Sequence, residues 1–199
     1  MNRNIHYGCG LSAPESWENY DVSPSLRLKS IPILGSLVKV EWQPNVKYGN
    51  IIKGIAPDNS AAFAYCSHVL EHLSLNDCRK AIKNTYMMLG EAGVFRLVVP
   101  DLKRLTELYL ESGDSVAFIK DTLLGTENRM RGFKGVIHHL LSNRNHLWMW
   151  DYESLAKELE SVGFKEVRRA SFNDSSHEIF KEVEEASRFE NALAIEAIK

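Results

Sequence analysis

The 199-residue sequence has no long hydrophobic run, few cysteines and almost no net charge. No apolar run reaches the roughly 18 residues that a membrane-spanning helix needs, and the first residues carry no apolar segment of the kind that directs secretion. Cys9, Cys66 and Cys78 lie far apart and match neither a disulfide framework nor a zinc-binding spacing. With 24 Lys and Arg against 26 Asp and Glu, no general attraction to nucleic acid arises. We expect a soluble, cytoplasmic protein with no membrane span.

Internal repeats and low-complexity segments are also lacking. The length suits one domain with a sizeable core, and we expect a single domain over residues 1–199. Short strand-forming runs alternate with amphipathic helical segments. The predicted strands are Asn4–Gly8, Trp17–Val22, Val46–Ile52, Ala62–Ser67, Val94–Val99, Phe164–Phe172 and Ala192–Ile198.

The predicted helices begin at side chains that can cap a first turn and end at glycine. They run from Ser74 to Gly90, from Asp101 to Gly113 and from Asp151 to Gly163, with a further amphipathic stretch up to Gly125. Residues 24 to 45 predict irregular chain or one short helix, and the Glu-rich segment 173 to 191 predicts a surface excursion. This alternation predicts an α/β fold, in which a mostly parallel sheet has helices on both faces.

Small and polar residues follow the predicted strands, where parallel sheets bind ligands. Gly8 and Gly10 follow the first strand, and glycine lets a ligand approach the backbone closely. Asp21 ends the second strand, where a carboxylate can accept both hydroxyls of a ribose. The same aspartate can also serve only to form a turn.

The order and spacing of several motifs resemble the type 11 methyltransferase domain, a family of class I S-adenosylmethionine (SAM)-dependent methyltransferases. These motifs are YGCG, YDVS, YGNI, SHVLEHL, LGEAGVFRLVVPDL and ESLAKELESVGFKEV. The resemblance implies a Rossmann-like methyltransferase fold with a C-terminal antiparallel strand. It also implies SAM as the cofactor and a small-molecule, lipid or quinone-precursor, or sugar acceptor as the partner.

The same resemblance assigns residues to the cofactor. The implied contacts are Tyr7, Gly8, Cys9 and Gly10 with the methionine part, Asp21 with the ribose, Asn50 and Ile51 with the adenine, and Ser67 and His68 beside the sulfonium and its methyl group. Asn50 stands where such enzymes usually place an aspartate, and its amide can still accept from the adenine amino group. Ile51 can alternatively be an ordinary core residue.

One feature departs from the family pattern. Only six residues separate Gly10 from Trp17, whereas a helical crossover between parallel strands takes about a dozen. The first helix is therefore shortened or missing. This departure, with Asn50 in place of aspartate, leaves open a non-catalytic binding or scaffold protein of the same fold.

Histidines are the candidate catalytic residues, because an oxygen acceptor needs a general base near neutral pH. The candidates are His68, His72 and His146. Asp101 follows the fifth strand and faces the same edge, although it can equally be a helix cap.

The segment from His68 to His72 matches the H-x-x-E-H pattern of inverted zinc hydrolases. That chemistry requires the segment to lie within a helix, whereas the flanking residues predict a loop between a strand and a helix. Some quinone-pathway O-methyltransferases of the family bind a divalent cation through the equivalent loop, which His68, Glu71 and His72 resemble. The alternative is that Glu71 and His72 bond to neighbouring loops, and we assign no metal from the sequence.

The block from Gly125 to Trp150 mixes basic residues with histidine and tryptophan. Such a composition can stack RNA bases, which leaves an RNA methyltransferase as an alternative function. Its position after the fifth strand favours a lid or substrate-binding insertion. Trp148 or Trp150 can instead belong to the core under the following helix.

Overall fold

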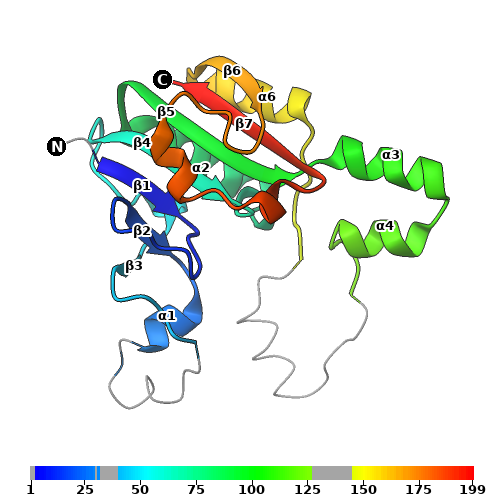
Figure 1. The fold of residues 1–199 in the computed structure, drawn as a ribbon, viewed down its shortest axis with the longest axis horizontal. Helices are drawn as coiled ribbons and strands as arrows, with labels where there is room; N and C mark the ends of the chain where they lie inside the picture. Colours follow the sequence, from blue (N-terminus) through cyan, green and yellow to red (C-terminus); the bar gives the residue numbers. More distant parts are fainter. Residues whose placement is uncertain (1–2, 30, 32–39, 127–144) are drawn as a thin grey trace.

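A computed structural model describes residues 3–29, 31, 40–126 and 145–199, which contain a seven-stranded sheet flanked by helices (Figure 1). The strand order is β3-β2-β1-β4-β5-β7-β6. The strands are β1 Arg3–Tyr7, β2 Glu18–Asp21, β3 Val46–Tyr48, β4 Ala61–Ser67, β5 Leu89–Pro100, β6 Lys165–Ala170 and β7 Ala192–Ile198. Pairings among β1 to β5 are parallel, whereas β7 runs antiparallel to β5 and β6. The predicted mostly parallel sheet with an antiparallel C-terminal strand is confirmed.

The third strand is shorter than the sequence predicts. Strand β3 ends at Tyr48, and Ile51–Lys53 forms a 3-10 helix, η2, instead of continuing the strand. Asn50 causes the change, because its side-chain oxygen accepts from the N–H of Ile52 at 2.9 Å and starts the turn. The prediction of a strand through Ile52 is therefore wrong.

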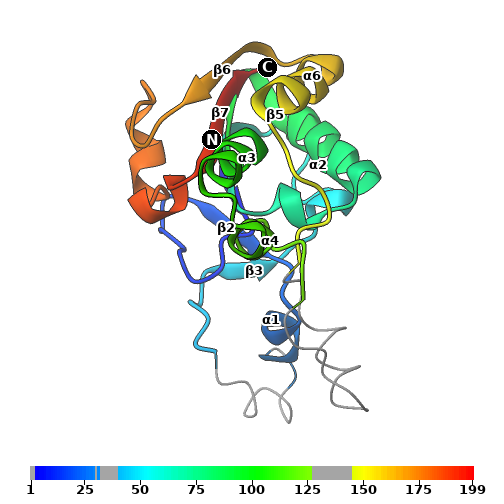
Figure 2. The same ribbon diagram turned by 90° about the vertical axis from the view of Figure 1, so that its right-hand side faces the viewer.

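Two α-helices cover one face of the sheet (Figure 2). They are α2 Leu75–Met88 and α6 Tyr152–Val162, and both begin at the predicted caps. The carboxylate of Asp151 and the hydroxyl of Ser154 satisfy each other's backbone N–H groups in a capping box. The helices pack on the sheet through a shared core that includes Ile82, Leu155 and Leu159.

Gly90 does not end α2 as predicted. The helix stops at Met88, and Leu89 already belongs to β5, where it pairs with Ala61. The carbonyl of Met88 accepts from Ser60 N–H at 2.9 Å, so a neighbouring loop satisfies the helix end without a left-handed glycine.

The opposite face is covered by the connection between β6 and β7 (Figure 2). This connection contains two 3-10 helices, η4 Glu178–Glu182 and η5 Ala186–Phe189. Phe180 and Val183 are buried against Trp17 and Tyr65. The predicted surface excursion is therefore partly wrong, because the connection supplies core residues to this face.

The same connection is held by a buried arginine of β5. Arg96 has no exposed side-chain surface and pairs with Glu184, with Glu196 at 3.1 Å and with Asp174 at 2.9 Å. A buried guanidinium persists only when such partners compensate its lost hydration. These contacts fasten the connection to the sheet.

The described chain between β1 and β2 contains no helix, as the short spacing predicts. After β2, the described residues before β3 include one short helix, α1 Pro24–Lys29. Helices α3 Leu102–Ser112 and α4 Ser115–Asp121 extend beyond the sheet (Figure 1). No described helix is both long and apolar enough to cross a membrane.

Candidate functional site

Four neighbouring strands end at one edge of the sheet, in the order β3, β2, β1, β4. Tyr7 pairs with Tyr20 of β2, and Tyr20 pairs with Lys47 of β3, so the carboxyl ends are aligned. The residues predicted to contact the cofactor follow these strands. The sheet order therefore brings together segments that lie far apart in the sequence.

The loop after β1 adopts a conformation that favours glycine. Gly8 and Gly10 have φ values of 66° and 56°, in the left-handed region. A Cβ atom on Gly8 would lie 2.2 Å from Cγ2 of Val69, whereas one on Gly10 would meet no atom within 4 Å. The chain therefore packs tightly at Gly8 and leaves space at Gly10 that a ligand can occupy.

Cys9 lies between these glycines with a buried side chain. Burial, together with the nearby Asp21, raises the pKa of the thiol to about 12. Cys9 therefore stays an uncharged thiol at neutral pH and can offer an apolar surface to a ligand.

Asp21 joins the ends of β1 and β2. Its carboxylate accepts from the N–H of Gly10 at 3.0 Å and from the N–H of Ser23 at 2.7 Å. Each oxygen keeps further acceptor capacity, because an ionised carboxylate has about four lone-pair sites. The geometry thus places a charged acceptor directly beside the glycine loop.

The side chains of three residues predicted to contact the cofactor already bond to, or pack against, other parts of the protein. The hydroxyl of Tyr7 bonds with Thr85 of α2 at 3.1 Å, and the Asn50 amide oxygen caps η2. Ile51 is buried in the main core, and its carbonyl accepts from the Asn84 amide at 2.7 Å. The side chain of Tyr7 lies in the core away from the edge, so only its backbone remains to approach a ligand there.

Ser67 is the last residue of β4, and His68 follows it directly. The hydroxyl of Ser67 is buried with no hydrogen-bond partner among the described residues. His68 has a φ of 53°, its Nδ1 lies 3.2 Å from Oε1 of Glu71, and its Nε2 lies 3.0 Å from the carbonyl of Arg188. Burial alone would lower the pKa of His68, but the adjacent Glu71 carboxylate outweighs it and the pKa is raised.

The three candidate catalytic histidines converge on Glu71. His72 lies beside it on the 3-10 helix η3 Leu70–His72, and the His72 and His146 ring centroids are 5.0 Å apart. Burial lowers the pKa of His146. Because the H-x-x-E-H segment forms a loop and a 3-10 turn, the helical requirement of a zinc hydrolase is not met.

Two contacts at this site could not be found from the sequence. The backbone N–H groups of Leu147 and Trp148 donate to the carbonyl of Glu71, at 2.7 Å and 3.2 Å. The carbonyl of Arg188 meets His68. Backbone contacts between distant segments leave no side-chain signal, so no motif indicates them.

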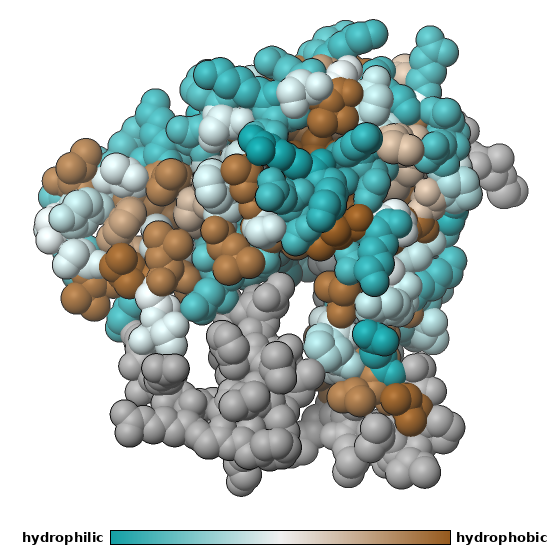
Figure 3. All heavy atoms as spheres, turned by 180° about the vertical axis from the view of Figure 1, so that it is seen from behind, coloured by the Kyte–Doolittle hydropathy of each residue, from teal (hydrophilic) through white to brown (hydrophobic). Residues whose placement is uncertain are grey.

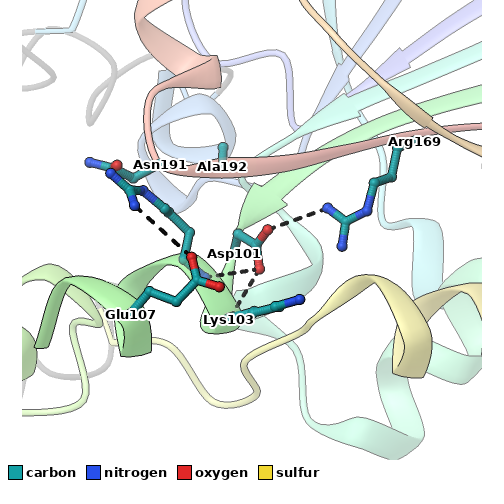
Figure 4. Close-up of a pocket in the computed structure, with 7 residues that line it drawn as sticks. Asp101, Lys103, Glu107, Arg169, Asn191 and Ala192 are labelled. Carbon is teal, nitrogen blue, oxygen red and sulfur yellow. Dashed lines mark hydrogen bonds and ion pairs between the residues drawn. The ribbon is translucent and has the colours of Figure 1, made fainter. Parts of the chain in front are cut away.

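Asp101 acts as the cap of α3. Its carboxylate accepts from the N–H groups of Lys103 and Arg104 and lies 3.6 Å from the guanidinium of Arg169. Figure 4 shows these charged side chains around a hollow of about 460 Å³ at the end of β5. This polar hollow contains none of the predicted cofactor residues.

A second hollow of about 560 Å³ lies along α4 and is mainly apolar, with Val116, Ile119 and Leu123 in its lining. Exposed hydrophobic side chains gather on α3 and α4 (Figure 3). Of the proposed lid, residues 127–144 lie outside the described chain. Within the described part, Trp150 belongs to the core, as one alternative predicts, whereas Trp148 is 40% exposed.

Solved structures with a similar fold are SAM-dependent methyltransferases. A SAM-dependent methyltransferase from Thermotoga maritima matches with a TM-score of 0.57 and 15% identity, over 100% of this chain and 83% of its own. One from Archaeoglobus fulgidus matches with a TM-score of 0.53 and 16% identity, over 100% and 86%.

A phosphoethanolamine N-methyltransferase from Haemonchus contortus, solved with S-adenosyl-L-methionine, matches with a TM-score of 0.51 and 12% identity, over 100% of this chain and 49% of its own. No protein-family model matches the sequence, and no curated protein does. The chain therefore has the Rossmann-like fold of class I SAM-dependent methyltransferases.

Proposed function

We propose that the protein is a SAM-dependent methyltransferase whose cofactor lies across the carboxyl ends of β1 to β4. The observation that carries the proposal is the contact between Asp21 and the N–H of Gly10, which places an acidic acceptor against a glycine loop. Open ligand-binding sheets use this arrangement for a nucleoside. Structural neighbours that bind SAM support the same assignment.

The residues at this edge fit the parts of the cofactor. The space beside Gly10 admits the methionine part, and Asp21 accepts the ribose hydroxyls. We place the adenine beyond the end of β3, beside the backbone of Asn50 and Ile51, because the Asn50 amide oxygen already caps η2 and the Ile51 side chain lies in the core. Ser67, whose buried hydroxyl bonds to no residue that the structure describes, is assigned to the methyl-bearing end.

The reaction is an in-line displacement at the methyl carbon. An acceptor oxygen, nitrogen or carbon forms the new bond as the carbon–sulfur bond breaks. The electron pair of that bond stays on sulfur and gives neutral S-adenosylhomocysteine. The sulfonium supplies the reactivity, and the protein supplies positioning and the exclusion of water.

A proton must leave an oxygen acceptor, and His68 is the first candidate to accept it, after one of its ring nitrogens has exchanged its contact with Glu71 or Arg188 for the acceptor. His68 follows β4 directly, next to the proposed methyl position, and its ring is oriented by Glu71 and Arg188. His72 and His146, each with a ring nitrogen within 4.8 Å of a Glu71 oxygen, form the second and third candidates. The acceptor class is a small molecule, a lipid or quinone precursor, or a sugar.

Calorimetric titration of the full chain with SAM and S-adenosylhomocysteine tests the proposal. We expect both to bind with a stoichiometry of one. Absence of binding at millimolar ligand by the folded protein would contradict the proposal and favour a binding or scaffold protein of the same fold. RNA binding that weakens steeply with salt would instead favour an RNA methyltransferase.

A further inference from the structure

Glu71 is a buried carboxylate with only one close charged or polar neighbour among the described side chains, the His68 ring. The side chain has no exposed surface, and neither oxygen accepts a hydrogen bond from a described residue. Removing a carboxylate from water costs several kcal/mol unless a cation or hydrogen-bond donors compensate. The nearest group, Nδ1 of His68, faces only one of the two oxygens, at 3.2 Å. Among the described residues, His68 is therefore a compensating group for one oxygen, and the second oxygen has none.

Two imidazoles complete a compact set of ligand atoms around Glu71. One carboxylate oxygen of Glu71 and one ring nitrogen each of His72 and His146 all lie within 4.8 Å of one another. Three atoms bound to zinc at about 2.1 Å stand no more than about 4.2 Å apart. Small side-chain rotations would bring these atoms into contact with one ion.

The ring nitrogens have the hydrogen-bonding pattern of metal ligands. Nδ1 of His72 lies 3.2 Å from the carbonyl of Asn145, to which it can donate. When Nδ1 carries the proton of the neutral ring, Nε2 of His72 keeps a free lone pair. Nε2 lies 4.0 Å from Oε1 of Glu71. Nδ1 of His146 is buried and has no hydrogen-bond partner in the described part of the chain. Ligating histidines generally donate their other ring N–H to a carbonyl in this way.

Backbone hydrogen bonds hold the segment that carries His146 against the segment that carries Glu71 and His72. The N–H groups of Leu147 and Trp148 donate to the carbonyl of Glu71 at 2.7 Å and 3.2 Å. His146 precedes both donors, so its ring is held against η3 without a metal. Such preorganisation reduces the free energy that binding would otherwise spend on ordering the ligands.

We propose that Glu71, His72 and His146 bind one divalent transition-metal ion, which fastens residues 145–148 to η3. Two imidazoles and one carboxylate suit zinc, iron, cobalt or manganese, whereas magnesium and calcium prefer oxygen ligands alone. Three protein ligands leave at least one position open to water or another molecule. The inference stands apart from the proposed methyl transfer, since binding needs no SAM.

Titration of the full chain with zinc chloride, followed by calorimetry, tests the site. Cobalt chloride gives a second readout, because Co²⁺ in a nitrogen and oxygen site produces visible absorption bands without a thiolate band. We expect one ion per chain and a thermal unfolding midpoint that rises with zinc and returns after chelation. Each of Glu71→Gln and His146→Gln should weaken zinc binding at least about tenfold.

His177→Asn is the matched control, because His177 packs on Phe63 at the opposite face of the sheet. It should bind zinc as the unaltered chain does. Circular dichroism and thermal unfolding without metal establish that each variant folds. The inference is overturned if the folded chain binds no zinc or cobalt at micromolar concentrations. It is equally overturned if the folded His146→Gln variant keeps the original affinity.

Discussion

At the scale of single residues, conformation and burial decide what the candidate site can hold. Gly8 shows the first effect, because its left-handed φ and its contact with Val69 exclude a side chain. His6 shows the second, because its ring is buried beside Trp17 and Tyr65. His6 lies on β1 and Gly8 follows the strand directly, so both residues are close in sequence to the proposed cofactor position.

Gly8→Ala should lower the free energy of unfolding by about 2 to 4 kcal/mol, because the cost of the left-handed conformation and the cost of the clash with Val69 are summed. Gly10→Ala is the matched control: its φ is also left-handed, but its Cβ would meet nothing. We expect it to cost about 1 kcal/mol. Denaturant unfolding of both variants measures the difference, and equal costs would show that the packing at Gly8 is loose.

His6 should make the protein less stable in acid. Burial lowers its pKa to about 4 from the ordinary 6.5, so the unfolded chain takes up a proton that the folded chain refuses. The folded protein therefore has its full free energy of unfolding above pH 6.5, where His6 is neutral in both the folded and the unfolded chain. That free energy decreases as the pH falls from 6.5 towards 4. The loss amounts to about 3 kcal/mol.

Unfolding free energies measured between pH 7 and pH 4 test this expectation, with His6→Phe as the comparison. The variant lacks the titrating ring and should lose about 3 kcal/mol less over that range. Parallel pH profiles for the two proteins would show that His6 is not the group responsible.

At the scale of elements, the connection between β6 and β7 covers the face of the sheet opposite α2 and α6. Phe180→Ala should cost about 3 to 5 kcal/mol, because the ring is buried among Trp17, Phe63 and Tyr65. Phe172→Ala is the control on the same connection, since that ring is 41% exposed, and it should cost much less. Similar losses in denaturant unfolding would mean that the connection is not part of the core.

Local signals explain which elements could be predicted. The starts of α2, α3 and α6 follow from Ser74, Asp101 and Asp151, because a capping side chain acts within its own first turn. The end of α2 could not be predicted, since Ser60 of another segment satisfies its last carbonyl. The core role of Phe180 was also hidden, because Trp17 lies at the other end of the chain.

In the candidate site too, features that depend on local sequence could be predicted, whereas contacts between distant segments could not. The order of Gly10, Asp21 and His68 along neighbouring strand ends could be predicted, because parallel strands share an edge. The family resemblance offered a cation at His68, Glu71 and His72 only as an alternative to bonds with neighbouring loops, and no metal was assigned from the sequence. The sequence offered no reason to bring His146 to Glu71, since that approach depends on backbone hydrogen bonds from Leu147.

At the scale of the whole molecule, the fold belongs to class I SAM-dependent methyltransferases, although the glycine loop lacks its usual helix. The central claim is that the ends of β1 and β2 bind the cofactor through Asp21. Asp114 provides a matched comparison, because it too accepts from two backbone N–H groups, at the start of α4.

Calorimetric titration with S-adenosylhomocysteine of the unaltered chain, Asp21→Ala and Asp114→Ala tests this claim most directly. We predict that the unaltered chain and Asp114→Ala bind alike, while Asp21→Ala loses about 1 to 3 kcal/mol of binding free energy with its charged acceptor. Equal affinity of the folded Asp21→Ala variant would contradict the account.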